Sequence, residues 1–444
     1  MTNKSMCHSL KIIRGTMCHS LKIIHGTLFT IFILLSLTRI CMGDGHEVPF
    51  TENDSRYDVP FSENHSRYPE YPVNWQGLPE PYHTKSANNP PRLIPRPKQA
   101  SLSVPEGFVV EEYLSDFLRP RFMLLGPEGE VLLSDIAAGV VYVIRDKKAA
   151  PLITNLDRPY GMALYQDWLY VAEASSVKRY RYSSSKGAVG KGEEVIPLNR
   201  YGTGHHITRS ILFDETAGKL YLTVGSASNV NLGEPPIRAA VSRFNSDGTG
   251  FELFATGIRN PIGLKWYPYA NNSDSKVLWV TSHERDGLGD DLVPDYFTRV
   301  QEGGFYGWPY AYIGPHEDPR HPGVAPDKVR QTLYPSVLLG SHVGSMDFTF
   351  YTGTQFPEKY LKGAFLALHG SWNRSKRTGY KIVFVPFENG QPVSGPEDFL
   401  TGWMLAEDKT EVWGRPVAVL QMPDGSLLIS DDGAGKLWRV SYTE

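Results

Sequence analysis

The chain has 444 residues, and its 42 glycines, 33 prolines and 41% hydrophobic residues exclude both a helical bundle and a disordered chain. A formal net charge of −3 gives no electrostatic footprint for a nucleic acid, which we do not expect as a partner. All cysteines (Cys7, Cys18 and Cys41) precede residue 44, which excludes disulfides and thiolate metal sites from the rest of the chain.

The first 43 residues have the features of an export signal. Two tandem copies of an 11-residue segment, starting at Met6 and Met17, carry basic residues and precede the apolar run LFTIFILLSL at 28–37. A basic stretch, a short apolar core and small residues after it are typical of a signal peptide. We therefore expect residues 1–43 to be a signal peptide and the protein to be secreted, or periplasmic if bacterial. An uncleaved N-terminal anchor is the alternative, and only then would a membrane be a partner.

Residues 44–100 have the composition of a poorly ordered linker. They contain a second 11-residue duplication, VPFTENDSRYD and VPFSENHSRYP, and are rich in proline, asparagine, serine and charged residues. Four Asn-x-Ser triplets are candidate glycan acceptors if the source is eukaryotic, at Asn53, Asn64, Asn271 and Asn373.

Residues 101–444 repeat one pattern six times. Each copy opens on a polar residue and continues as an apolar strand, a turn and a second apolar strand with an acidic or small polar end, as in RPRFMLLGPEGEVLLSD from residue 119. Such repeats predict an all-β fold, a six-bladed β-propeller. The strand at 108–114 has no copy of its own and is expected to complete the last blade. A β-sandwich is the alternative, but it leaves the shared register of six copies unexplained.

The longest interruption between strands spans residues 284–340. Within it we expect a short helix over 294–302, stopped by Gly303 and Gly304. A loop this long in a compact domain is usually functional.

The register places the residue that opens each repeat at one mouth of the central channel. These residues are Arg119, Arg158, His206, Asn260, His342 and Arg415, and Arg259 precedes Asn260. The second strands return to the same mouth with acids and further histidines. Arginine binds carboxylates bidentately and stacks on flat rings, so the cluster predicts a flat ligand with several carboxylates. For each arginine alone, a solvated or salt-bridged side chain is the alternative.

Two further groups at this mouth suggest chemistry. A histidine, His206 or its neighbour His205, could act as a general base. Oxygens of Glu284, Asp286, Asp290 or Asp291, or backbone carbonyls around Arg285, suit Ca²⁺, and an acidic surface loop is the alternative.

Aromatic side chains close to the same mouth could bind a sugar. Trp372 in GSWNR, with Tyr306 and Trp308 in GGFYGWPY, could form a stacking wall, and His369 lies three residues before Trp372. Ordinary packing is the alternative for both tryptophans.

Five stretches resemble the glucose/sorbosone dehydrogenase family, the soluble quinoprotein sugar dehydrogenases, and in particular its sorbosone-type members. They are HITRSILF from residue 206, IRNPIGL from 258, HERDGLGDDLVPDYFTRVQEGGFYGWPY from 283, ALHGSWNRSKRTGYKIVFV from 367 and GRPVAVLQMPDGSLLISDDGAGKLWRV from 414. The resemblance covers residues 105–442. It implies a six-bladed propeller that binds pyrroloquinoline quinone (PQQ) with Ca²⁺, oxidises a sugar hemiacetal or aldehyde, and passes electrons to an external acceptor.

The resemblance also implies roles for individual residues. The general base falls on His206, with His205 as an adjacent alternative. The pair that clamps the cofactor falls on Arg259 and Asn260, and the arginine of the last blade on Arg415. The Ca²⁺-binding loop, which uses main-chain carbonyls, falls near Arg285 and Asp286. The lysine that the glucose enzymes bring from the fifth blade has three competing counterparts, Lys376, Arg377 and Lys381, and Trp413 stands where those enzymes have a second arginine.

Two other functions fit parts of this pattern. A non-catalytic extracellular propeller that binds a ligand or a protein would need no redox cofactor, but such proteins carry cysteine-rich companion modules that residues 44–444 lack. A Ca²⁺-dependent lactonase on a similar propeller would need a cluster of carboxylates in the channel, whereas this mouth is rich in arginine.

Overall fold

The structure is a computed structural model that describes residues 71–185, 187–202, 204–269 and 276–443. The predicted signal peptide, residues 44–70 of the predicted linker and the triplets at Asn53, Asn64 and Asn271 lie outside these ranges. Within the described ranges, no helix combines the length and the hydropathy that crossing a membrane requires.

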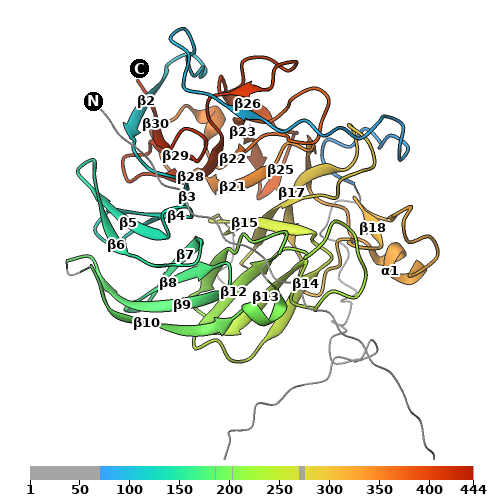
Figure 1. Ribbon diagram of the computed structural model, residues 1–444, viewed down its shortest axis with the longest axis horizontal. Coiled ribbons are helices and arrows are strands. Elements are labelled where there is room, and N and C mark those ends of the chain that lie inside the picture. Colours follow the sequence, from blue (N-terminus) through green and yellow to red (C-terminus); the bar gives the residue numbers. More distant parts are fainter. Residues whose placement is uncertain (1–70, 186, 203, 270–275, 444) are drawn as a thin grey trace, which may run out of the picture. The chain divides into compact units, whose positions relative to one another are not determined.

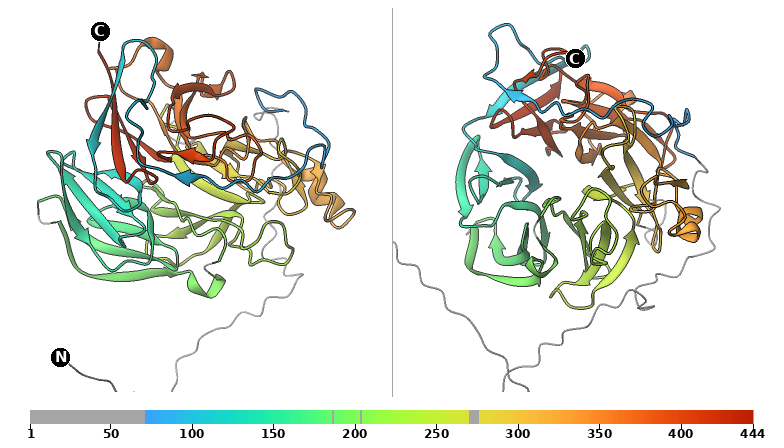
Figure 2. Two further views of the ribbon diagram at one scale, coloured as in Figure 1. Left: turned by 45° about the horizontal axis from the view of Figure 1, so that its top comes forward. Right: turned by 45° about the vertical axis from the view of Figure 1, so that its right-hand side comes forward.

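Six antiparallel sheets of four strands stand around a central axis, which confirms the predicted six-bladed β-propeller (Figure 1 and Figure 2). We number the blades 1 to 6 in chain order and give the strands of each from the innermost outward. Blade 1 is β3 (Pro120–Leu125), β4 (Val131–Asp135), β5 (Val140–Arg145) and β6 (Lys148–Ile153); blade 2 is β7 (Pro159–Tyr165), β8 (Trp168–Glu173), β9 (Ser176–Ser183) and β10 (Gly187–Pro197); and blade 3 is β11 (Ile211–Asp214), β12 (Lys219–Val224), β13 (Ala240–Asn245) and β14 (Glu252–Thr256). Blade 4 is β15 (Asn260–Trp266), β16 (Leu278–His283), β17 (Pro294–Val300) and β20 (Val337–Ser341); blade 5 is β21 (Ser345–Phe350), β22 (Ala364–Leu368), β23 (Lys381–Val385) and β26 (Glu397–Leu400); and blade 6 is β28 (Pro416–Gln421), β29 (Leu427–Asp431), β30 (Lys436–Tyr442) and β2 (Phe108–Leu114).

The two ends of the repeat region close the ring. As expected, β2 forms the outer strand of blade 6, where it pairs antiparallel with β30, so the first and last strands of the ring share one sheet. The innermost strands also contact one another in sequence from β3 around to β28 and back to β3. This closure fixes all six strand openings around one axis.

The acidic residue that ends several second strands has a structural role. Asp135 accepts hydrogen bonds from the backbone N–H groups of Leu118 and Arg119, at 2.8 and 3.0 Å. Asp431 accepts one from the backbone of Arg415 at 2.6 Å in the same way. A buried backbone donor needs a partner, and these carboxylates provide it. The repeated acid therefore locks the entrance of the first strand onto the end of the second.

The predicted helix at 294–302 is wrong, because Pro294–Val300 form β17, the third strand of blade 4. Tyr296 and Phe297 pair with Ser282 and Thr281 of β16 and are completely buried. The segment is rich in aromatic and β-branched residues, which favour strands, and it supplies the third strand of blade 4. The two glycines that follow therefore come after a strand and not after a helix. The remaining loop carries a hairpin of β18 (Ala311–Tyr312) with β19 (His316–Glu317), and the short helix α1 (Pro326–Gln331).

Residues 71–100, which we call the strap, run across the outside of the ring (the blue chain in Figure 1). Their short strand β1 (Arg92–Leu93) pairs in parallel with β27 (Glu411–Val412). Near the N-terminal end of the strap, the backbone N–H of Val73 donates to the carbonyl of Ser336 at 2.9 Å. This part of the predicted linker therefore makes specific contacts with the propeller.

Candidate active site

One mouth of the channel holds a cavity of about 240 Å³. Its lining is polar and comes from blades 3 to 6, with no described lining residue from blade 1 or 2. The lining residues are His205, His206, Arg259, His283, Glu284, Asp286, Asp295, His342, Gly344, His369, Gly370, Trp372, Asn373 and Arg415. The structure thus brings together most of the residues that the sequence placed at this mouth.

His206 presents a nitrogen that can accept a proton. Its Nδ1 lies 3.0 Å from both the carbonyl and the hydroxyl oxygen of Ser226, and that hydroxyl donates to the carbonyl of Ser228. Because a carbonyl can only accept, Nδ1 carries the proton and Nε2 is left as the acceptor. Burial and the nearby charge of Arg259 hold the pKa of His206 well below its usual 6.5, so the ring is neutral at physiological pH.

The neighbouring histidine occupies a different environment. The His205 ring lies 4.5 Å from that of His206 but is exposed, and the His205 backbone has a φ of +55°. Burial and Arg259 also lower the pKa of His205. Behind His206, a Cβ at Gly225 would lie 2.7 Å from the Cβ of His206, so a side chain there would displace the imidazole.

Arg259 is only 2% exposed and is held by the loops between strands. It donates to the backbone and side-chain oxygens of Asn229, each at 3.0 Å, to the carbonyl of Glu284 at 2.7 Å, and to Oδ2 of Asp286 at 3.0 Å. Asn229 also accepts a hydrogen bond from the backbone N–H of Asp286 at 2.9 Å. The arginine therefore contributes positive charge to the cavity, while most of its N–H groups are already used.

Asn373 connects blades 4 and 5 at the cavity. Its Nδ2 donates to Oδ1 of Asp286 at 2.6 Å and to Nδ1 of His342 at 3.1 Å. His342 in turn donates from Nε2 to the carbonyl of Gly289 at 2.9 Å, which fixes its neutral tautomer. Asn373 is buried in this network, so its interpretation as a glycan acceptor is wrong.

His369, which lies in the same segment between β22 and β23 as Asn373, pairs with Asp432. His369 Nε2 lies 2.7 Å from one carboxylate oxygen, and the other accepts from Arg121 at 2.6 Å. Burial and the charge of Arg415 lower the pKa of His369 to about 3. To the described residues, the Arg415 side chain donates only long hydrogen bonds, 3.3 Å each, which end on the carbonyls of His369 and Gly370. Its guanidinium thus retains capacity for a ligand.

The side chains predicted as metal ligands do not form a cage. Burial raises the pKa of Glu284 to about 8, so in the metal-free protein its carboxyl is protonated at neutral pH. The Arg285 side chain is turned away to Asp318, with Nε 3.2 Å from the carboxylate. Asp286 lines the cavity but is already bonded to Arg259 and Asn373. In the part of the chain that the structure describes, no group of three or more His, Cys, Asp or Glu could hold a metal ion.

Two residues predicted to bind the cofactor from blade 5 do not line the cavity. Lys376 is exposed. Arg377 is buried, and its guanidinium donates to Asn89 of the strap and to the carbonyls of Ser371 and Lys409. The GSWNRSKR motif therefore reaches the cavity through Trp372 and Asn373, while the cations after them face outward or hold the strap.

Other expected residues also fall outside the cavity lining. Asn260 is buried behind it, with Nδ2 3.4 Å from Nδ1 of His283. Trp308 is buried, and its indole N–H donates to the carbonyl of Asn229 at 2.9 Å. Arg119 is exposed, and Arg158 pairs with the adjacent Asp157 at 2.9 Å. Of the two predicted tryptophans, only Trp372 reaches the cavity, with half of its surface exposed.

Sequence reasoning missed Asn229 and Arg121 and gave Asn373 another role. Arg121 follows two residues after Arg119, and this second arginine in one repeat opening was an available signal. Asn229 lies in a loop with no motif or periodicity, so only the structure could reveal that it holds both Arg259 and Asp286.

Comparison with known proteins shows which family this chain belongs to. The TrAA12-like family model matches residues 102–294 and 327–443. A pyrroloquinoline quinone-dependent pyranose dehydrogenase of Coprinopsis cinerea is 23% identical over an alignment of 417 residues that covers 78% of this chain and only 55% of that protein. An uncharacterized protein of Borreliella burgdorferi is 29% identical over an alignment of 356 residues that covers 77% of this chain and 91% of that protein.

Solved structures agree on the fold. The family AA12 carbohydrate-active enzyme of Trichoderma reesei, in iodide and calcium forms, superposes with TM-scores of 0.66 and 0.65 at 20% and 19% identity. The match covers 79% of this chain and 100% and 99% of those chains. Because the family model matches well over half of the sequence, the chain belongs to the TrAA12-like family.

Proposed function

We propose that this protein is a PQQ-dependent dehydrogenase that oxidises an aldose or a related, sorbosone-like sugar aldehyde at C1 and passes the electrons to an external acceptor. The observation that carries the proposal is His206, a desolvated neutral imidazole at the cavity with Nε2 free to accept a proton. The similarity to a PQQ-dependent pyranose dehydrogenase supports the choice of cofactor and substrate class.

The cavity suits a flat polycarboxylate such as PQQ. Arg415 is weakly engaged and Arg259 adds a second positive charge. Oε1 of Glu284 and Nε2 of His283 are buried without a hydrogen-bond partner among the described residues. Such orphaned atoms in a cavity wall need a ligand or water. The donors and acceptors present therefore match a polar, anionic ligand.

In the proposed reaction each residue has a defined task. When bound, PQQ would supply the oxidising power that the side chains lack. His206 takes the proton of the C1 hydroxyl at Nε2, because its Nδ1 proton is committed to Ser226. Arg415 and Arg259 stabilise negative charge at the centre of the site. The half-exposed Trp372 offers a ring at the cavity rim for the sugar to pack on.

Calcium remains a separate prediction, which no set of side chains among the described residues supports. The calcium form of the Trichoderma reesei enzyme favours it, and main-chain carbonyls of the loop around Arg285 remain its candidate ligands. Titration of PQQ with and without a chelator tests it. Equal affinity in both would remove Ca²⁺ from the proposal without affecting PQQ. Secretion likewise remains a proposal, since residues 1–43 lie outside the described ranges.

The decisive experiment measures PQQ binding to the purified protein by calorimetry, followed by reduction of an artificial dye when aldoses are added. We expect binding at micromolar concentrations or tighter and sugar-dependent turnover. A protein that binds no PQQ at these concentrations would instead be a non-catalytic propeller that binds a ligand or a protein.

A further inference from the structure

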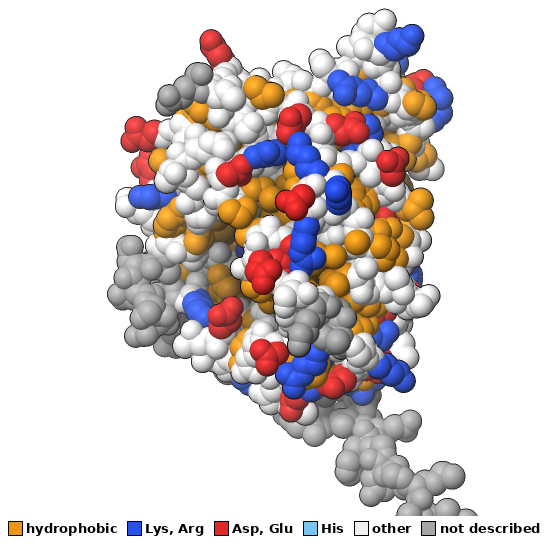
Figure 3. Space-filling view, turned by 90° about the vertical axis from the view of Figure 1, so that its left-hand side faces the viewer, with side chains coloured by type: hydrophobic (Ala, Val, Ile, Leu, Met, Phe, Trp, Pro, Cys, Tyr) orange, Lys and Arg blue, Asp and Glu red, His pale blue; other side chains and the backbone are white. Residues whose placement is uncertain are grey.

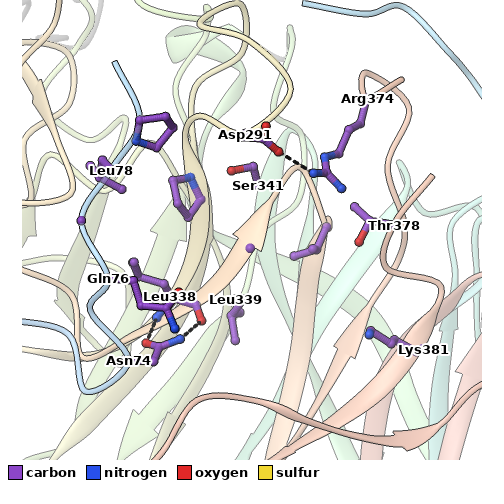
Figure 4. Close-up of a pocket in the computed structure, with 15 residues that line it drawn as sticks. Asn74, Gln76, Leu78, Asp291, Leu338, Leu339, Ser341, Arg374, Thr378 and Lys381 are labelled. Carbon is purple, nitrogen blue, oxygen red and sulfur yellow. Dashed lines mark hydrogen bonds and ion pairs between the residues drawn. The ribbon is translucent and has the colours of Figure 1, made fainter. Parts of the chain in front are cut away.

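The strap lies outside both the six blades and the residues that the family model matches. Its start packs along β20, where Asn74 donates to the carbonyl of Leu338 at 2.9 Å and accepts from the same residue's N–H at 3.0 Å (Figure 4). A hollow of about 390 Å³ lies beside it, bordered also by Asp291 and Arg374, which form an ion pair. The strap therefore runs past two loops that continue to the cavity.

The first of these loops, residues 284–293, carries Asp286. Thr84 Oγ1 accepts from the N–H of Asp290 at 2.8 Å, and Ser86 Oγ accepts from that of Gly289 at 3.1 Å. Gly289 has a φ of +123°, and a Cβ there would lie 2.8 Å from Thr84 Oγ1. Gly289 is also the residue whose carbonyl fixes His342. The strap thus holds the loop at a contact where only glycine fits.

The second loop, residues 369–380, carries Trp372 and Asn373. The N–H of Asn89 donates to the carbonyl of Trp372 at 2.7 Å. Its side chain donates to the carbonyls of Arg374 and Ser375 at 3.0 and 3.2 Å. Asn89 Oδ1 accepts from Arg377 at 3.0 Å. One asparagine of the strap therefore satisfies four groups of this loop.

The two loops meet where Asn373 donates to Asp286, at the cavity. We propose that Thr84, Ser86 and Asn89 are positioning residues, which place Asp286, Asn373 and Trp372 for substrate recognition. The inference rests on the proposed function for its substrate. The strap makes no hydrogen bond to His206 within the described structure, so its loss should weaken sugar binding more than it slows the chemical step.

The test uses the full chain with Asn89→Ala, Thr84→Val and, as a matched control, Arg92→Ala. Arg92 also lies in the strap, but its side chain is exposed and pairs only with Glu411. Hydrogen exchange is followed in peptides covering residues 284–293 and 369–380, and KM and kcat are measured for the sugar. Thermal unfolding verifies that each variant is folded.

We expect Asn89→Ala to speed exchange in 369–380 and Thr84→Val to speed it in 284–293, each by about fivefold or more, the equivalent of one lost hydrogen bond. KM should rise by a similar factor with kcat within about twofold, and Arg92→Ala should change neither.

Should Asn89→Ala fail to fold, Thr84→Val, which keeps the shape of the side chain, decides alone. The inference would be overturned if exchange were unchanged in Asn89→Ala and Thr84→Val, or if Arg92→Ala raised the exchange rate and KM as much as they do. A wild-type protein without PQQ binding would instead refute the proposed function, and the exchange data would still test the strap.

Discussion

The channel mouth has two unequal sides. On the side of blades 3 to 6, His206, Arg259, Asp286 and Asn373 line one cavity, and Asp286 joins Arg259 to Asn373 through hydrogen bonds. On the side of blades 1 and 2, the arginine that opens each repeat is exposed or paired with its own neighbour. The side of the molecule that carries these two blades shows acidic and basic side chains interspersed (Figure 3). The repeat alone therefore does not make a site.

Loop length accounts for the difference between blades 3 to 5 and blades 1 and 2, whereas blade 6, with the short segment 432–435, lines the cavity through Arg415. In blades 1 and 2, the second and third strands are separated by residues 136–139 and 174–175. In blades 3, 4 and 5, the corresponding segments are 225–239, 284–293 and 369–380. These longer loops carry Asn229, Asp286 and Asn373. The blades supply a rigid ring, and the loops on one side supply the chemistry.

The largest effect is expected from His206→Ala on the cavity side. Without an acceptor for the hydroxyl proton, kcat should fall about 10²- to 10⁴-fold. PQQ affinity, measured by calorimetry, should change little. His205→Ala is the matched control and should retain most of the turnover, because His205 is exposed. The reverse result would move the base to His205.

Glu284→Gln should alter how stability depends on pH. The folded protein keeps the Glu284 proton up to about pH 8, whereas an ordinary glutamate loses it near 4.5. The unfolded state therefore binds fewer protons between these values, and the contribution of Glu284 to stability is lost as the pH rises. Urea unfolding at pH 5, 7 and 9 should show a smaller decline in the variant than in the wild type. Parallel declines would mean that Glu284 is ionised in the folded protein.

The repeat pattern was sufficient to predict the ring but not its asymmetry. Six repeats that open in the same register predict six blades. The strand at 108–114, which belongs to none of the six copies, predicts that the ring is closed by pairing it with the last blade. Side-chain direction in a long loop depends on the loop's own contacts, which no periodicity encodes. Arg377 lies in the right motif yet turns to the strap, and Asn373 matches a glycan triplet yet is buried at the cavity. The loops that carry the site are thus the part that sequence reasoning predicts least well.

Asp286→Asn tests, within the loop 284–293, whether a buried ion pair contributes more to stability than a more exposed one. It keeps the shape of the side chain but removes the carboxylate that pairs with the buried Arg259. The free energy of unfolding should fall by about 1–3 kcal/mol, measured in urea. Asp291→Asn, in the same loop but in a more exposed pair with Arg374, should cost at most about 1 kcal/mol. Equal costs would show that the network around Arg259 contributes nothing beyond a surface ion pair.

The smallest effect is expected from Arg158→Ala, on the side of blades 1 and 2. This arginine opens its repeat just as Arg415 does, so register alone would predict equal importance. Its guanidinium is partly exposed and bound to Asp157, whereas that of Arg415 lines the cavity. PQQ affinity should therefore change less than about twofold in Arg158→Ala and about tenfold or more in Arg415→Ala, where a charged hydrogen bond to the ligand is lost. A tenfold loss in Arg158→Ala would mean that the ligand extends across the whole channel mouth, and that the six openings act together as their shared register first suggested.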